Sequence, residues 1–233
     1  MPFDRLAAYI GEPTATGRCT FMRVNGIGTS DEPLRLASIV RHPDMADEST
    51  LDEALLQTRQ VVDALESALS AIKMDELISS TLDTSEELKQ VLQVGDSTAL
   101  HTGSYYSAGA AILAGTRLII AGIGRIKVWL WSEQTLQVLI EPTVMLIPES
   151  PDASSILTST IGIGFTRDKV QFAEAQLESD QLVVLEMGID LLQVPESSGQ
   201  EGKITSARSL LDRIERELQI KPPLIAVIGP MES

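Results

Sequence analysis

The sequence predicts an α/β fold of the α+β type, in which two mainly antiparallel sheets lie between layers of helices. Its segments come in the order strands, two helices, many strands, then one helix and one strand. Hydrophobic residues make up 43% of the chain but aromatic residues only 4%, so Val, Ile, Leu and Ala must supply most of the core, which suits layered sheets and helices. With 233 residues the chain can bury a full core, and we expect residues 1–233 to form a single domain.

Strands are predicted first and a long helix second. Between Cys19 and Val40, two short apolar runs flank the turn-rich segment NGIGTSDEP and predict two strands. Thr50 and Glu53 form a capping box, and apolar residues then recur at spacings of three, four and seven as far as Ile72. This pattern predicts a helix that begins just after Thr50.

A second helix and a loop are predicted next. Thr84 and Glu87 form another capping box, which predicts a short helix through Leu88 and Leu92. The polar segment from Gly95 to Gly103 is predicted to be a loop.

The segment from Ile112 to Trp131 predicts a β-hairpin. An apolar strand is followed by a turn at Gly115 and Thr116 and by a second strand of β-branched and aromatic residues. Strand-like runs follow at residues 134–140, 169–177, 180–187 and 224–229. Between the last two, the apolar spacing of residues 206–220 predicts a helix.

The second strand of the hairpin carries a resemblance to a known family. Residues 118–130, LIIAGIGRIKVWL, resemble the "LyVAnvGDSRaYL" strand of the metal-dependent protein phosphatases of type 2C, the PPM family. Gly124 falls on the glycine of that motif. Arg125, Ile126 and Lys127 stand where the family has aspartate, serine and arginine.

Three later segments resemble the family in the same order. LTSTIG, ending at Gly162, resembles "LTRALG", and LESDQLVVLEMGIDLL, residues 177–192, resembles "lkpgDrLLLaSDGLwDvl". In the second motif Asp180, Gly188 and Asp190 match the family. The last helix and LIAVIG resemble the closing helix and strand, so the resemblance covers Tyr105 to Ile228 and implies a four-layer α-β-β-α sandwich.

The resemblance also implies a two-metal site whose ligands this chain lacks. In the family two metal ions activate a water that attacks phosphoserine or phosphothreonine, and hard divalent cations require carboxylate oxygens. Met187 replaces the aspartate of the SDG motif, and Pro222 and Pro223 replace the DN pair. The N-terminal strands, including residues 38–42, offer no aspartate at the remaining positions. The chain is therefore expected to be a pseudophosphatase with no catalytic residues, metal or cofactor.

One alternative keeps the catalytic activity. An active metal-dependent serine/threonine phosphatase could have moved its ligands, for example into the loop from Asp44 to Glu53. His42, Asp44, Asp47 and Glu48 lie close together there, but acids before a helix N-terminus are more simply explained by the helix dipole.

Other motifs have structural interpretations. The Gly-Ile-Gly triplets at residues 26–28, 122–124 and 162–164 do not extend to a nucleotide-binding motif and are interpreted as strand-end turns or bulges. Gly95-Asp96-Ser97 precedes the hairpin, so its likeness to GDSR is interpreted as a coincidence in a loop. Trp129 and Trp131 are interpreted as sheet packing. A serine triad is not expected, because no GxSxG motif exists.

Composition excludes several classes of partner. The net charge of −15, from 33 acids and 18 bases, argues against nucleic acid or an anionic membrane, since phosphates are bound through clustered Lys and Arg. Cys19 is the single cysteine, which excludes an internal disulfide and a cysteine-rich zinc site and favours the cytoplasm. The N-terminus is not a signal peptide pattern, and the apolar stretch from Leu118 to Gly124 is too short to span a bilayer.

These observations favour protein recognition as the function. The expected partner is another protein, such as a phosphoprotein or a component of a kinase pathway, with a symmetric homodimer as the alternative. The expected contact residues are Arg125, Lys127 and Glu186, which would meet the Pro222-Pro223 turn if the resemblance holds. A simple exposed strand edge is the plainer interpretation of Arg125 and Lys127.

Overall fold

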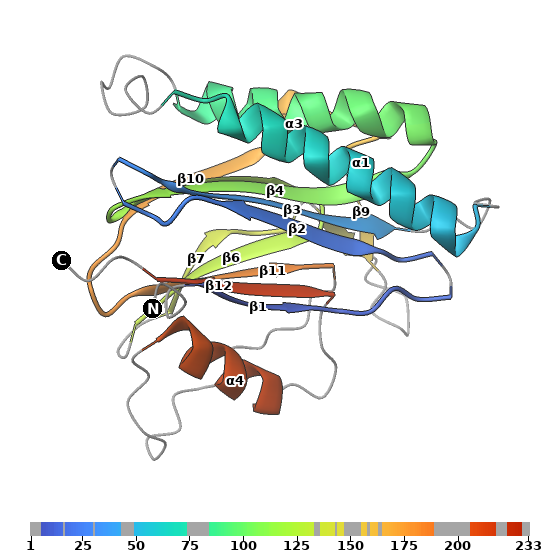
Figure 1. The fold of residues 1–233 in the computed structure, drawn as a ribbon. Coiled ribbons are helices and arrows are strands. Elements are labelled where there is room, and N and C mark those ends of the chain that lie inside the picture. Colours follow the sequence, from blue (N-terminus) through green and yellow to red (C-terminus); the bar gives the residue numbers. More distant parts are fainter. Residues whose placement is uncertain are drawn as a thin grey trace.

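The protein is an α-β-β-α sandwich, which confirms the predicted fold. The computed structural model describes residues 6–15, 17–29, 31–42, 49–73, 84–132, 136–142, 144–146, 155–157, 159–162, 165–188, 206–217 and 223–229. Two five-stranded antiparallel sheets lie face to face, with two helices covering one sheet and one helix covering the other (Figure 1).

The first sheet has the strand order β10-β5-β4-β3-β2. Its strands are β2 (Thr20–Asn25), β3 (Leu34–His42), β4 (Tyr105–Ala114), β5 (Arg117–Ile123) and β10 (Gln171–Gln176). Along each strand, alternate side chains point to opposite faces. One face, including Ile39, Tyr106 and Ile119, packs against the two helices above it.

The second sheet has the strand order β1-β12-β11-β6-β7. Its strands are β1 (Leu6–Ile10), β6 (Ile126–Trp131), β7 (Leu136–Ile140), β11 (Leu182–Met187) and β12 (Leu224–Ile228). The edge strand β1 was not predicted from the sequence and pairs with β12. A separate short ladder joins β8 (Val144–Leu146) to β9 (Ser155–Leu157).

The predicted hairpin is only half correct. The turn at Gly115 and Thr116 does join β4 to β5. The second strand was predicted as one unit, but it breaks at Gly124, whose φ is +88°, and continues as β6 in the other sheet. A side chain at Gly124 would also approach Ser107 Oγ to 2.5 Å, so the crossing between the sheets requires glycine.

Two antiparallel helices, α1 (Leu51–Ser70) and α3 (Thr84–Ala99), form the upper layer (Figure 1). The predicted capping box of α1 is present, because the Thr50 side chain accepts from the Glu53 N–H and the Glu53 carboxylate accepts from the Thr50 N–H. The loop predicted from Gly95 to Gly103 is wrong. Most of it is helical, since α3 runs to Ala99 and a 3₁₀ turn follows at Leu100–Thr102.

Gly95 shows why a glycine occurs inside this helix. A Cβ there would lie 2.5 Å from Leu65 Cδ2 of α1, so the missing side chain lets the two helices approach closely. Sequence patterns treat glycine as a loop signal, and the interhelical contact overrides that signal.

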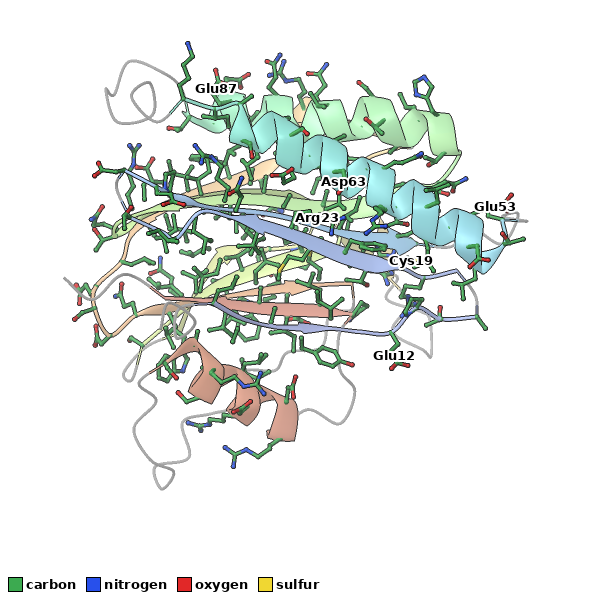
Figure 2. All side chains as sticks on the ribbon, viewed as in Figure 1. Glu12, Cys19, Arg23, Glu53, Asp63 and Glu87 are labelled. Atoms are coloured by element: carbon green, nitrogen blue, oxygen red, sulfur yellow. The ribbon has the colours of Figure 1, made fainter. Side chains whose placement is uncertain are left out.

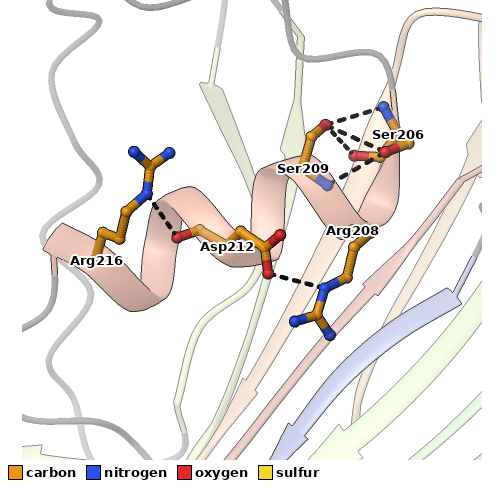
Figure 3. A network of polar contacts seen from close by, with 5 residues as sticks. All are labelled: Ser206, Arg208, Ser209, Asp212 and Arg216. Carbon is orange, nitrogen blue, oxygen red and sulfur yellow. Dashed lines mark hydrogen bonds and ion pairs between the residues drawn. The ribbon is translucent and has the colours of Figure 1, made fainter.

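Helix α4 (Ala207–Glu217) forms the lower layer. Ser206 accepts a hydrogen bond from the Ser209 N–H at its start, and Arg208 forms a 2.8 Å ion pair with Asp212 one turn later (Figure 3). Its apolar side, including Leu211 and Ile214, packs on the outer face of the second sheet. None of the helices in the described part of the chain is long and apolar enough to cross a membrane.

Candidate functional site

The positions that match the phosphatase motifs meet at one end of the sandwich. Arg125 lies in the crossing between β5 and β6, Gly188 follows β11, and Pro223 precedes β12. The Gly188 N–H donates to the Arg125 carbonyl at 2.9 Å, and a Cβ at Gly188 would lie 2.6 Å from Pro223 Cγ. Pro222 and Asp190 lie outside the described residues.

Met187 lies inside the core between the two sheets. It is fully buried, and it belongs to an apolar cluster with Val40, Ile126 and Leu224. The position that carries a metal-binding aspartate in the resembling motif therefore contributes a thioether to a dry aliphatic layer. A thioether does not hold magnesium or manganese.

A buried hydrogen-bonded pair lies at the same end of the first sheet. His42 Nε2 and Ser107 Oγ are 2.7 Å apart, and both residues are buried. Ser107 Oγ also accepts the N–H of Arg125 at 2.8 Å. The His42 ring stacks on Tyr105 with 5.8 Å between the ring centroids.

The electrostatic surroundings keep His42 neutral. Burial lowers the pKa of the imidazole from 6.5 to about 3, and the positive charges of Arg125 and Arg18 contribute to the same shift. At neutral pH the ring is therefore uncharged and serves as one partner of the Ser107 hydroxyl.

These contacts form one continuous seam between the sheets. The seam consists of His42 and Ser107 in the first sheet, Arg125 at the crossing, and Gly188 and Pro223 in the second sheet. It ends at the edge strand, where the Gly11 N–H donates to the Pro223 carbonyl at 2.8 Å. These hydrogen bonds join backbone groups and neutral side chains, and they connect the two sheets at this end.

Among the described residues, the side chains do not converge as a two-metal centre requires. Such a centre needs several carboxylate oxygens converging on one point. Within the described ranges no group of three or more His, Cys, Asp or Glu side chains is placed to hold a metal ion. Asp44, Asp47 and Glu48 lie outside those ranges, and the predicted absence of a metal stays a prediction.

The three predicted contact residues have different surroundings. Glu186 is only 2% exposed and lies opposite Lys127 on neighbouring strands. Both alternate with the inward-facing Ile126 and Met187, so they point toward the α4 side of the sheet rather than into the core between the sheets. Of the three predicted contact residues, Glu186 is buried, whereas Arg125 and Lys127 are half-buried.

Lys127 already has neighbours on its own chain. Its ammonium lies 3.7 Å from a Glu141 carboxylate oxygen and 5.2 Å from the centre of the Trp129 ring. Trp129 is buried with the α4 residues, and Trp131 packs against the same cluster, which confirms that both tryptophans serve sheet packing.

The sequence did not reveal the role of Arg41. This side chain is 1% exposed, and its guanidinium donates to Ser104 Oγ at 3.0 Å and to the Gly17 carbonyl at 2.7 Å. Burial raises the pKa of the neighbouring Cys19 thiol, although the charge of Arg41 and a hydrogen bond with Thr58 oppose that shift. The only sequence signal for this structural role is that Arg41 directly follows the apolar run LRLASIV.

Gly95-Asp96-Ser97 is not the loop that the sequence suggested. It lies in α3, and Asp96 Oδ1 accepts the N–H of Gly162 at 2.7 Å. The glycine of the LTSTIG segment is therefore held by the helix layer. The motif has a structural role that its resemblance to GDSR did not indicate.

Comparison with known proteins yields likeness in structure only. No family model matches the chain, and no curated protein matches its sequence. A bacterial serine phosphatase is 12% identical with a TM-score of 0.68, covering 98% of this chain and 97% of that one. The phosphatase Stp1 from Staphylococcus aureus is 11% identical with a TM-score of 0.64, at 98% and 94% coverage. The phosphatase PstP/Ppp from Mycobacterium tuberculosis is 16% identical with a TM-score of 0.59, at 98% and 99% coverage.

Identities this low establish the fold and nothing about activity. The matches extend over almost the whole chain, including the strands before Tyr105 where the motif resemblance was weak. The chain therefore has the fold of the PPM-type serine/threonine phosphatases.

Proposed function

We propose that this chain is a catalytically inactive, phosphatase-like protein that acts by recognising another protein. The observation that carries the proposal is the place of Met187. Its side chain belongs to the apolar layer between the sheets, where a phosphatase with this motif would need a metal-bound carboxylate.

Further support comes from the seam. A two-metal site needs an open, polar pocket for a water and a phosphate. Here the corresponding end contains the buried His42 and Ser107 pair, the apolar side chain of Met187 and the packing of Gly188 on Pro223. A free, buried Cys19 also suits the reducing cytoplasm, where we place the protein.

A metal and activity measurement tests the proposal. After purification in manganese, we expect no bound manganese and no manganese-dependent hydrolysis of phenyl phosphate or of a phosphothreonine peptide. Met187→Asp alone should not restore turnover, because one carboxylate cannot build a two-metal site. Stoichiometric manganese with turnover that a chelator abolishes would instead establish the active phosphatase with relocated ligands.

The partner surface of this proposal includes Arg125 and Lys127. A net charge of −15 steers the protein toward a partner with a basic face. Charge reversal at both residues, Arg125→Glu with Lys127→Glu, is expected to change the affinity and its salt dependence in a pull-down. If every partner is retained with unchanged affinity and salt dependence, this end of the molecule is not a contact surface.

A further inference from the structure

The helix layer carries a groove on its outer face. It lies between α1 and α3, has a volume of about 770 Å³, and is lined by residues that include Gln57 and Gln60 of α1 and Val94, Ser97 and His101 of the α3 segment. None of its lining residues is an acid, a lysine or an arginine. We call this feature the helix groove.

Large apolar side chains are exposed beside the helix groove. Leu56 is 58% exposed, Val94 40% and Leu100 60%. Val94 lines the groove, and Leu56 lies one turn from the lining residue Gln60 on α1. Leu100 is the chain neighbour of the lining residue His101. Eight large apolar residues are exposed in the described ranges, and four of them lie in the helix layer, namely Leu51, Leu56, Val94 and Leu100. Exposed apolar residues that lie together are typical of a contact surface.

Acidic residues outnumber basic ones in the two helices that form the groove. Helices α1 and α3 together contain seven acids against two bases, but three of these acids, Asp63, Glu86 and Asp96, have partners elsewhere on this chain. Glu53 and Glu87 lie at opposite ends of the helix layer (Figure 2). Glu53 is one turn before Gln57, and Glu87 is two turns before Val94, so each belongs to a row that leads into the groove. Hydrogen bonds with Thr50 lower the pKa of Glu53, which keeps it charged.

We propose that the helix groove docks a basic amphipathic helix of a partner protein. The apolar side of such a helix would cover Leu56, Val94 and Leu100, and lysines or arginines toward its two ends would face Glu53 and Glu87. The 16 residues of α3 extend about 24 Å, which sets the length of the docked helix. The inference rests on the proposed recognition function and names the chemistry of the partner segment.

A synthetic peptide tests the helix groove on the full chain. The probe is a fluorescein-labelled 16-residue helix of leucine on one side and lysine on the other, and its counterpart carries glutamate in place of lysine. We expect fluorescence anisotropy to show that the lysine peptide binds and that its affinity falls as salt is added. Its affinity should be at least tenfold higher than that of the glutamate peptide.

Single substitutions show where on the chain the lysine peptide binds. We expect Leu56→Glu and Leu100→Glu each to weaken the binding of the lysine peptide at least tenfold. Glu87→Lys should weaken this binding and reduce its salt dependence. Val138→Glu, at a residue 40% exposed on β7 of the other sheet, is the matched control and should leave binding unchanged. Circular dichroism of each variant checks that the fold is retained.

Three outcomes would overturn the docking proposal. The first is an equal loss of peptide binding in the Val138→Glu control, and the second is equal binding of the two peptides. The third is a concentration-dependent dimer of the unmodified chain that Leu100→Glu dissociates, because the helix groove would then be a contact between two copies of the chain. Manganese-dependent phosphatase turnover would overturn the proposed function alone. In that case, peptide binding at the helix groove would still support the docking proposal.

Discussion

At the scale of single residues, Ser107 has the most demanding position at the end of the sheets. Its hydroxyl is fully buried, pairs with His42 Nε2 and accepts the Arg125 N–H. Removing it leaves two buried polar groups without this partner, each of which costs roughly 1–3 kcal/mol. We expect Ser107→Ala to lower the free energy of unfolding by about 2–4 kcal/mol in urea titrations.

The matched control for this change is Ser97→Ala. Ser97 is exposed on α3, and its hydroxyl bonds only to the carbonyl one turn earlier. Its replacement should change the free energy of unfolding by less than about 0.5 kcal/mol. Equal effects of the two substitutions would show that the seam does not stabilise this end of the protein.

His42 makes stability depend on pH. Its pKa in the folded protein is about 3, below the ordinary value of 6.5, so the unfolded chain binds this proton more readily. The stabilisation is complete above pH 6.5 and falls as the pH is lowered toward 3, by up to about 1.4 kcal/mol per unit.

The measurement compares the free energy of unfolding at pH 7 and pH 5 in the unmodified protein and in His42→Gln. Glutamine can hydrogen-bond to Ser107 but does not titrate. We expect the unmodified protein to lose about 2 kcal/mol more than the variant. The charged groups that lower the pKa of His42 are Arg125 and Arg18. Parallel losses in both proteins would contradict a neutral buried His42.

At the scale of helices and strands, local sequence signals predicted which type of element forms more accurately than they predicted where each element begins and ends. The capping box at Thr50 and Glu53 placed the start of α1 correctly, because both of its hydrogen bonds are local. Gly95 was misinterpreted as part of a loop, and the break of the hairpin strand at Gly124 was missed, because each glycine serves a contact distant in sequence. Gly95 allows α3 to approach Leu65, and Gly124 allows the chain to cross between sheets beside Ser107.

Asp96 ties the helix layer to the segment that ends at Gly162. The carboxylate accepts the Gly162 N–H at 2.7 Å, and a charged acceptor makes such a bond worth roughly 1.5–3 kcal/mol. We expect Asp96→Ala to lower the free energy of unfolding by about 2 kcal/mol and Asp96→Asn to lower it less, since an amide oxygen can still accept. Equal effects of alanine and asparagine would contradict this role.

At the scale of the whole molecule, motif order predicted the fold although no single motif is complete. The four matched segments lie far apart in the sequence, and Arg125, Gly188 and Pro223 meet only when β6, β11 and β12 pair in the second sheet. The seam could not be predicted, because His42 and Ser107 are separated by 65 residues and carry no local pattern. The burial of Glu186 was missed for a related reason, since it depends on the packing of β6 and β11.

At the scale of the whole molecule we also expect stability not to depend on divalent cations, because no metal-holding group of carboxylates occurs among the described residues. A ligand at a hundred times its Kd stabilises a folded protein by about 2.7 kcal/mol. For a domain of this size that corresponds to a rise in Tm of roughly 5–10 °C. We expect the Tm to change by less than about 1 °C between millimolar manganese, millimolar magnesium and a chelator.

Met187→Asp sharpens this last test. An aspartate there would place a carboxylate in the apolar layer beside Val40, Ile126 and Leu224, and we expect a loss of at least about 3 kcal/mol that manganese does not recover. Met187→Leu, which preserves the volume and the apolar character, should cost less than about 1.5 kcal/mol. Recovery of the aspartate variant by manganese would mean that further oxygen ligands converge on this position, and the proposed absence of a metal site would then be wrong.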